Sequence, residues 1–388
     1  MSLKGVCGTA RPQQRQPNLF VGRFPGEYRR SPFFFSGSHG MERGLAMISV
    51  KDVARVAVVA AAVCVSLVSA ASAAVNIETV TVGNPGNVAD TRYASPGYGA
   101  VAYTYNIGKY EVTAGQYTAF LNAVAKTNTY ALYNTNMSNT SYGSGITRSG
   151  GGTVGNPYTY SVATAFTNRP VNCVSWGDAA RYANWLHNGQ PTAPQGLSTT
   201  EDGAYFLNGA TSDAALLAGT RKADWKWAIT SEDEWYKAAY YKGGGTNAGY
   251  WDYPTSSNTA PGQDMADASG NNANYYTAPL AYPIDSGKYT TVAGEFQNSD
   301  SPYGTFDQGG NVWEWNEAII DGSYRGLRGG SFAPGGGDLR AADRGYYDPS
   351  FEVSHFGFRV SGVPEPATMS LLALGGLGML MRGRSVRG

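Results

Sequence analysis

Two carboxylates that could hold a hard cation lie seven residues apart in GTFDQGGNVWEW, residues 304–315. Asp307 lies in a glycine turn. Glu314 alternates with two tryptophans on an expected strand, so its side chain points away from the apolar layer. Carboxylates with backbone carbonyls between them suit an oxygen-seeking cation such as Ca²⁺. The alternative interpretations are an Asx turn at Asp307 and a buried ion pair between Glu314 and an arginine.

A second unusual stretch, RGGSFAPGGGDLRAADRG at residues 328–345, combines glycines with arginines and aspartates. Either the backbone approaches a ligand closely here, or it turns tightly inside a packed domain. We expect the arginines of this region to pair with nearby acidic side chains. The arginines are Arg328, Arg340, Arg344 and Arg359, and the expected partners are Asp338, Asp343 and Glu352. Ion pairs and tight turns are the simpler explanation, and ligand binding is the alternative.

Cysteine and histidine are scarce, which limits the metal and redox chemistry of the chain. Cys7 and Cys64 precede or lie inside an apolar N-terminal segment, so the mature domain keeps only Cys173. A disulfide within that domain is therefore excluded. With only His187 and His355 beyond that segment, the domain also lacks the ligands of a Cys/His zinc site. Because long loops usually need a staple, a bound metal is the remaining candidate.

Composition indicates a loop-rich extracellular domain with an aromatic core. Charged residues make up 15% of the chain, while 51 glycines and 27 tyrosines favour turns and aromatic packing. The formal net charge is zero, so no basic surface for nucleic acid is expected. No composition break divides residues 75–362, and we expect one domain there.

The N-terminal region predicts secretion. From Met47, two basic residues precede an apolar run and then small residues with an A-x-A pattern at 71–73, as in signal peptides. The apolar run is shorter than the ~20 residues of a spanning helix. We therefore expect a signal peptide at 47–74, removed by signal peptidase, and a gene-model extension or disordered leader at 1–46.

Capping residues and apolar spacing predict three helices. One begins after Thr113, with Gln116 as its capping-box partner, and a second begins at Ser175. The third begins at Ser231, with Glu234 as its capping-box partner. We assign the acidic residues at 232–234 to complementarity with the helix N-terminus rather than to catalysis. Short strands are expected at 101–107, 171–174, 311–315, 324–327 and 355–360, with long loops at 127–168 and 242–303.

Six stretches, taken in order, carry a family resemblance. They are IGKYEVTAGQYTAFLNAVA (107–125), RPVNCVSWGDAARYANWL (169–186), AITSEDEWYKAAYY (228–241), GTFDQGGNVWEW (304–315), LRGGSF (327–332) and FGFRV (356–360). Together they resemble the sulfatase-modifying factor family, whose founding members are formylglycine-generating enzymes. The resemblance covers about 78–361. It implies an irregular α/β (α+β) fold that is C-type-lectin-like and has little regular secondary structure.

The resemblance also implies copper chemistry whose ligands this sequence lacks. Active enzymes of the family oxidise a sulfatase cysteine to formylglycine, using copper held by two thiolates just after the segment equivalent to 329–332. Here Pro334 stands about where the first thiolate belongs, and no cysteine follows it. Because such an oxidase needs soft thiolate ligands, we expect neither copper nor catalytic residues. Cys173 is expected to be a buried, inert side chain.

For cation and ligand binding, the resemblance implies three groups of residues. A calcium site would use Asp307, Gly310, Val312 and Glu314, with the glycine and the valine contributing carbonyl oxygens and Asp307 standing where relatives have asparagine. A second calcium site would include Asn274, Tyr275 and Asp285. A ligand cleft would contain Ser331, Phe332, Arg328, Arg340 and Arg344, among which Ser331 is the best single candidate.

Residues 363–388 combine a Pro-Glu-Pro motif, a short apolar stretch at 369–381 and three arginines. Together these features resemble the PEP-CTERM sorting signal of Gram-negative bacteria. The resemblance implies export, transient association with the inner membrane, cleavage by an exosortase, and release to the cell surface or the extracellular matrix.

Three functions stay open. The favoured one is a non-catalytic binding or structural module, a pseudoenzyme stabilised by Ca²⁺ that could take a saccharide or a protein ligand. The second is an oxidoreductase of the formylglycine-generating family that acts on protein cysteine by divergent chemistry, with Cys173 as a participant. The third is a ligand-binding variable domain diversified by a retroelement, which would share this fold.

Overall fold

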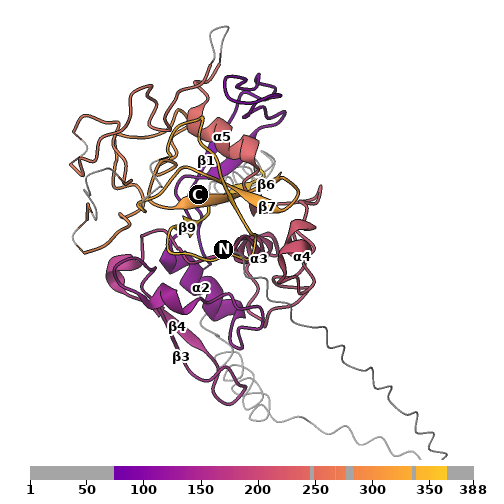
Figure 1. Cartoon of the computed structure of the whole chain (residues 1–388). Coiled ribbons are helices and arrows are strands. Elements are labelled where there is room, and N and C mark those ends of the chain that lie inside the picture. Colours follow the sequence, from indigo (N-terminus) through magenta and orange to yellow (C-terminus); the bar gives the residue numbers. More distant parts are fainter. Residues whose placement is uncertain are drawn as a thin grey trace, which may run out of the picture. The chain divides into compact units, whose positions relative to one another are not determined.

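Two four-stranded sheets and three capped helices position the charged side chains of the domain (Figure 1). The computed structural model describes residues 74–244, 249–266, 268–276, 284–285, 287–333 and 338–364. All of these residues belong to one compact unit of the chain. The expected leader at 1–46, nearly all of the expected signal peptide and most of the expected sorting signal lie outside them.

The first and third predicted helices begin where their capping residues predict. α2 spans Ala114–Val124 behind the N-cap Thr113, and α5 spans Glu232–Tyr240 behind the N-cap Ser231. Both capping boxes are formed as expected. The capping box satisfies backbone N–H groups that the first helical turn leaves unpaired. The starts of these two helices therefore depend on residues that are close in sequence.

The second predicted helix, α3, spans Trp176–His187 and is also confirmed. Its N-cap Ser175 forms a capping box with Asp178. Three shorter helices were not predicted: α4 (Asp213–Leu217), η1 (Thr135–Ser138) and η2 (Thr164–Phe166). No helix among the described residues is long and apolar enough to cross a membrane.

One sheet joins strands from both ends of the described chain. Its order is β1-β2-β10-β5, and all neighbours are antiparallel. The strands are β1 (Thr79–Val82), β2 (Tyr105–Gly108), β10 (Val360–Gly362) and β5 (Trp227–Ile229). The last strand of the domain therefore lies between two others, which fixes the chain up to residue 362.

The second sheet carries Glu314. Its order is β8-β7-β6-β9, with β6 and β9 parallel and the other neighbours antiparallel. The strands are β8 (Gly345–Tyr347), β7 (Tyr324–Arg328), β6 (Trp313–Ile320) and β9 (Phe356–Gly357). A separate hairpin pairs β3 (Ile146–Ser149) with β4 (Thr159–Val162).

Neighbouring side chains of β6 face different helices, because side chains alternate along a strand. The indole of Trp315 donates to the carbonyl oxygen of Val174, just before α3, at 3.0 Å. Glu314 instead accepts from Trp235 of α5. Figure 1 shows α5 and α3 on opposite sides of β6 and β7. The expectation that Glu314 points away from the neighbouring tryptophan layer is therefore confirmed at Trp315.

The irregular α+β fold with little regular secondary structure that the resemblance implies is confirmed. The strand at 324–327 is confirmed, and those expected at 101–107 and 311–315 exist with shifted bounds. The strand expected at 171–174 is wrong, because Cys173 has a left-handed φ of 57° that ends any extended run. The strand expected at 355–360 is split into β9 and β10.

Candidate functional site

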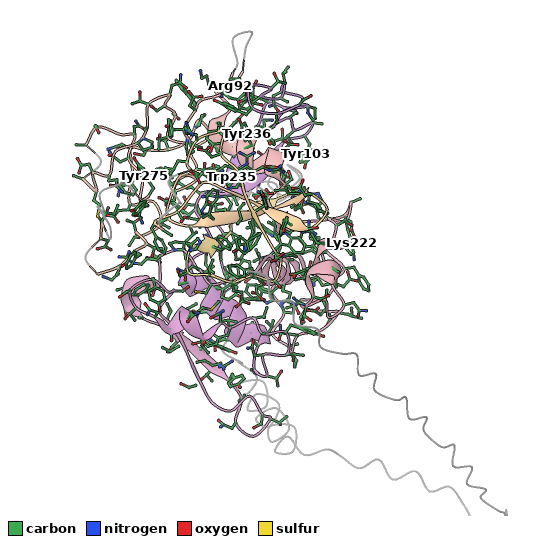
Figure 2. All side chains as sticks on the ribbon, in the orientation of Figure 1. Arg92, Tyr103, Lys222, Trp235, Tyr236 and Tyr275 are labelled. Carbon is green, nitrogen blue, oxygen red and sulfur yellow. The ribbon has the colours of Figure 1, made fainter. Side chains whose placement is uncertain are left out.

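Glu314 lies at the centre of a buried ion pair between β6 and α5. Its carboxylate accepts hydrogen bonds from Nε and Nη2 of Arg359 at 2.6 and 2.7 Å, and from Nε1 of Trp235 at 2.8 Å. Trp235 lies on the side of α5 that faces the sheet (Figure 2). The interpretation of Glu314 as part of a buried ion pair is confirmed. Its Oε1 accepts only one of these bonds and therefore keeps a lone pair.

Asp307 reaches the same region from the turn before β6. It has a left-handed φ of 59°, and its Oδ2 accepts a hydrogen bond from the Gly294 backbone N–H at 2.6 Å. Its Oδ1 accepts no hydrogen bond from the described residues. Burial, opposed by that backbone donor, raises the pKa of Asp307 to about 6. The Asx-turn interpretation has no hydrogen bond to support it in the described part of the chain.

A third carboxylate, Glu111, was missed by the sequence analysis. Its side chain is 2% exposed, and neither carboxylate oxygen has a hydrogen-bond partner in the described part of the chain. Burial raises the pKa of Glu111 well above its ordinary value, and the charges of Asp307 and Glu314 raise it further. A charged residue directly before an apolar helix start, in KYEVT, was the only sequence signal for this position.

We call Glu111, Asp307 and Glu314 the carboxylate cluster. The guanidinium of Arg359 is the cation that acts on all three, so the cluster has an excess of acid groups. Buried charges normally require pairing, proton uptake or a bound cation. An orphaned carboxylate beside two others therefore fits the hard-cation chemistry that the resemblance implies.

The backbone around the carboxylate cluster offers further oxygen ligands. The carbonyl oxygens of Gly310 and Val312 accept no hydrogen bond from any described residue. Among the residues that the structure describes, no three acidic, histidine or cysteine side chains converge closely enough to hold a metal by themselves. Carbonyl and water oxygens would therefore have to complete the coordination shell, as is common for Ca²⁺.

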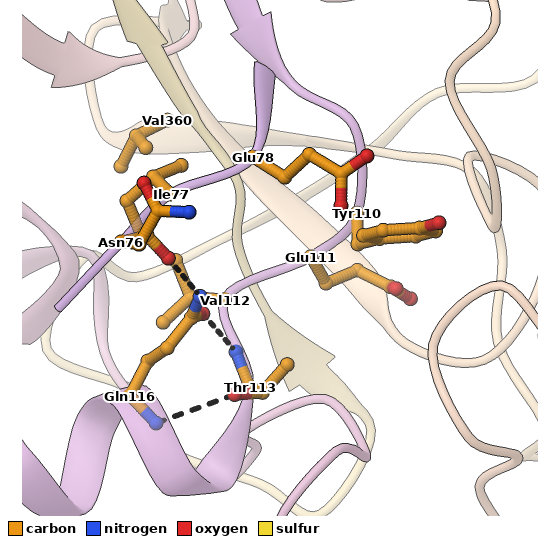
Figure 3. A pocket seen from close by; sticks show the side chains of 9 residues that line it. All are labelled: Asn76, Ile77, Glu78, Tyr110, Glu111, Val112, Thr113, Gln116 and Val360. Atoms are coloured by element: carbon orange, nitrogen blue, oxygen red, sulfur yellow. Dashed lines mark hydrogen bonds between the residues drawn. The ribbon is translucent and has the colours of Figure 1, made fainter.

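A small pocket gives access to Glu111. It has a volume of about 170 Å³, and Glu78 and Tyr110 lie in its wall with Glu111. In Figure 3 the carboxylates of Glu78 and Glu111 extend toward the same side, with the Tyr110 ring between them. Glu78 at this opening is paired with Lys109, and Glu111 is the buried carboxylate that the pocket reaches.

The second expected calcium group lies beside the first but is only partly described. Asn274 pairs with Gly310 in an isolated bridge, and its Oδ1 is buried without a partner. The hydroxyl of Tyr275 donates to the carbonyl oxygen of Pro261 at 2.6 Å. Asp285 forms an ion pair with Arg169. The orphaned Asn274 oxygen fits a cation ligand, whereas the Asp285 carboxylate already has a cationic partner.

The residues expected to line a ligand cleft are mostly buried. Ser331 and Arg328 are both 0% exposed and Phe332 is 3% exposed. The Ser331 hydroxyl accepts a hydrogen bond from the Ala333 backbone N–H at 3.1 Å, which makes a local turn. Phe332 packs against the ring of Tyr289. The loop at 334–337 lies outside the described residues, so the ligand cleft stays a prediction.

The expected partners of the arginines are only partly correct. Arg340 pairs with Asp343 at 3.1 Å, as expected. Arg328 and Arg344 instead share Glu232 at the start of α5, with distances of 2.7 and 2.5 Å. Glu232 therefore does more than complement the helix N-terminus: it ties α5 to the segment around β7.

Cys173 has no redox partner in the described domain and is 1% exposed. Burial, followed by the nearby charge of Glu352, raises the pKa of the Cys173 thiol to about 12. The thiolate required for metal binding or nucleophilic attack is therefore disfavoured. This agrees with the expectation that Cys173 is a buried, inert side chain.

Comparisons with known proteins place these features in a family. The family model described as "sulfatase-modifying factor enzyme 1-like domain" matches residues 70–362, and the PEP-CTERM protein-sorting motif matches residues 362–385. The sorting motif indicates export by the exosortase route of Gram-negative bacteria. No curated protein matches the chain.

Solved structures similar to this chain include three with low sequence identity. Treponema denticola variable protein 1 is 19% identical, with a TM-score of 0.45 and coverage of 74% of this chain and 95% of that one. CarF is 19% identical, with a TM-score of 0.42 and coverage of 75% and 99%. PvdO from Pseudomonas aeruginosa is 17% identical, with a TM-score of 0.33 and coverage of 74% and 91%.

The expected recognition is therefore confirmed on both counts, the domain and the sorting motif. With three quarters of its length matched by one family model, this chain belongs to the sulfatase-modifying factor enzyme 1-like domain family.

Proposed function

We propose that this chain is a non-catalytic member of its family, exported to the cell surface or matrix and stabilised internally by Ca²⁺. The observation that carries the non-catalytic assignment is the state of its cysteines. The sequence has no cysteine after Cys173, and that thiol is buried with a raised pKa. Copper chemistry that depends on a thiolate pair lacks both donors.

The calcium assignment is supported by the unpaired oxygens around Glu314. Glu111 contributes two buried carboxylate oxygens without partners, and Asp307 contributes Oδ1. Ca²⁺ would supply positive charge to this acidic interior and connect β6 with the segment before α2. Such an ion would act as a staple for the loop-rich chain, in place of the disulfide that the sequence excludes.

The calcium proposal is tested by thermal unfolding of the full chain after removal of divalent ions with a chelator. Millimolar Ca²⁺ is expected to raise the melting temperature, because a ligand that binds only the folded state stabilises it. The variants Glu111→Gln and Asp307→Asn keep side-chain size and should lose most of this rise. Glu78→Gln at the pocket edge, a side chain 58% exposed, serves as the matched control and should keep it.

A parent chain whose melting temperature ignores Ca²⁺ would end the calcium proposal. So would an equal rise in all three variants, because that pattern indicates binding elsewhere. Asp307→Ala combined with Glu314→Ala is the more severe variant, but it also breaks the Arg359 ion pair. The two single isosteric changes therefore carry the test.

The non-catalytic assignment needs a separate activity measurement. The full chain is incubated with copper(I) and a cysteine-containing sulfatase peptide, and the peptide mass is followed. We expect unmodified peptide under conditions in which an active family enzyme converts it to formylglycine. Formylglycine formation that Cys173→Ser abolishes would establish the alternative, an oxidoreductase of divergent chemistry.

A further inference from the structure

A second pocket, remote in sequence from the carboxylate cluster, lies where the domain ends. Its volume is about 760 Å³, within the range of small-molecule sites. Residues from α3, from the β5 region and from the end of the domain form its wall. The members used below are His187, Trp225, Lys226, Trp227 and Val363. We call it the tryptophan pocket.

Two part-exposed indole rings give the tryptophan pocket flat apolar surfaces. The guanidinium of Arg221 lies 4.3 Å from the centre of the Trp225 ring and covers it on one side. The Trp227 ring packs on Gly362, where an added Cβ would lie 3.1 Å from a ring carbon. Both rings are thus held in place by the fold, and a rigid ring loses little entropy when a ligand stacks on it.

Hydrogen-bond donors without partners surround these rings. His187 Nδ1 accepts a hydrogen bond from the Lys226 backbone N–H at 3.1 Å, which places the ring proton on Nε2 when His187 is neutral. Burial, followed by the charge of Lys226, lowers the pKa of His187 and favours this neutral form. In the described part of the chain, neither indole N–H donates to another residue.

Lys226 supplies a positive charge that the domain does not neutralise. Its side chain is exposed, and its ammonium forms no ion pair with a described residue. Lys222 nearby is already paired with Asp202. Asp224 is the other acidic residue that acts on His187, but it does not line the pocket.

The backbone that carries the pocket is fixed by sheet pairing. β10 pairs with β5, with Gly362 opposite Trp227. The Val363 N–H then donates to the Lys226 carbonyl oxygen at 3.0 Å, which extends the pairing by one residue. Trp227 therefore lies on a paired strand, and Trp225 and Lys226 lie in the segment that leads directly into it.

We propose that the tryptophan pocket binds an acidic saccharide through a uronate unit. The C–H face of a pyranose ring would stack on an indole, and the carboxylate would pair with Lys226. The ring hydroxyls would accept hydrogen bonds from His187 Nε2 and from the indole N–H groups. A neutral saccharide would leave the ammonium unused, and an aromatic acid would leave most of the donors unused.

The proposal is tested by calorimetric titration of the full chain with trigalacturonate, maltotriose and benzoate. Trigalacturonate should bind and quench tryptophan fluorescence, with at least tenfold tighter binding than either of the other two. Lys226→Gln should weaken trigalacturonate binding at least tenfold. Lys126→Gln, at an exposed lysine without an ion pair in the described chain, is the matched control and should bind as the parent does.

Trp225→Ala and Trp225→Phe separate stacking from charge. The alanine variant should abolish the fluorescence change and most binding, while the phenylalanine variant keeps a flat ring and should retain part of both. Because Trp225 also packs against the core, melting curves confirm that each variant is folded. The Lys226 comparison does not depend on that packing.

Absence of trigalacturonate binding by the parent overturns the proposal, as does unchanged binding by Lys226→Gln. Equal affinity for maltotriose would show that the charge of Lys226 is not recognised. Equal affinity for benzoate would identify an aromatic-acid site instead. None of these outcomes depends on whether Ca²⁺ stabilises the domain, so this proposal and the calcium proposal can fail separately.

Discussion

Glu314 on β6 and Arg359 just before β10 form a bidentate ion pair whose side chains are 1% and 0% exposed. The pair is not isolated, because Trp235 donates to the carboxylate and carbonyl oxygens accept from the guanidinium. A buried ion pair stabilises a fold only when such additional bonds offset the cost of removing both charges from water. This arrangement couples both sheets to α5 through a single carboxylate.

Arg359→Met should destabilise the domain strongly. The substitution leaves the Glu314 carboxylate buried without its cation, which typically costs about 3–5 kcal/mol. Urea unfolding of the parent and the variant measures the difference. The control is Lys109→Met, which removes the exposed ion pair with Glu78 and should cost at most about 1 kcal/mol. Similar losses in both variants would contradict the coupling role of Glu314.

Gly310→Ala should also be severely destabilising. Gly310 has a φ of +89°, and an added Cβ would lie 2.2 Å from the Asn274 carbonyl oxygen. The variant must therefore move the bridge that brings Asn274 beside the turn. Gly322 is a matched control, because its φ is +67° and nothing lies within 4 Å of the added atom.

For these two glycine variants, unfolding by urea separates collision from backbone strain. Gly322→Ala should lose only the ~1 kcal/mol typical of an alanine in a left-handed conformation. Gly310→Ala should lose clearly more, since it adds a backbone collision to the same strain. Equal losses of unfolding free energy would mean that the Asn274 carbonyl oxygen moves away from the added Cβ at little cost.

The unfolding free energy should fall as pH rises through neutrality because of Glu352. Burial, then the adjacent Asp178 carboxylate, raises the pKa of Glu352 to about 9 from an ordinary 4.5. The folded state therefore keeps a proton that the unfolded state releases between these two values. In that window the folded state binds more protons than the unfolded state does. The contribution of Glu352 to stability is therefore full below pH 4.5 and is lost as the pH rises toward 9.

Glu352→Gln isolates this contribution, because the amide imitates the protonated acid but does not titrate. The Asn134 amide N–H donates to Glu352 Oε2 in the parent, and the carboxamide oxygen of the glutamine can accept the same hydrogen bond. Urea midpoints measured across the window should decline less steeply in the variant than in the parent. Parallel declines would show that Glu352 is ionised in the folded domain.

The helices could be predicted from sequence because their start signals lie in adjacent residues. Thr113 and Ser231 each have the partner of a capping box three positions later. The strand at 171–174 could not be excluded from sequence, since only the packed structure shows that Cys173 is left-handed. In the sequence, β9 and β10 look like one strand. Of the two residues between them, Phe358 is apolar and Arg359 turns inward to meet Glu314.

The candidate site was only partly predictable for the same reason. Asp307 and Glu314 lie in one segment, so their spacing is visible in the sequence. Glu111 comes from a distant segment and joins them only through tertiary contact. Likewise, the pairing of Arg328 and Arg344 with Glu232 depends on how α5 packs beside β7, which no local pattern encodes.

The thiol of Cys173 should be unreactive in the folded domain. Burial raises its pKa from the ordinary 9.0 to about 12, so the thiolate is strongly disfavoured at mildly alkaline pH. Its side chain is also 1% exposed, which blocks approach of a reagent.

In a chain carrying Cys7→Ser and Cys64→Ser, a chromogenic disulfide reagent reports on Cys173 alone. We expect labelling to be limited by opening of the fold, to become fast in denaturant, and to slow further with any ligand that stabilises the folded state. Fast labelling of the native chain would show an accessible thiolate. That result would support the alternative function, in which Cys173 takes part in an oxidoreductase reaction.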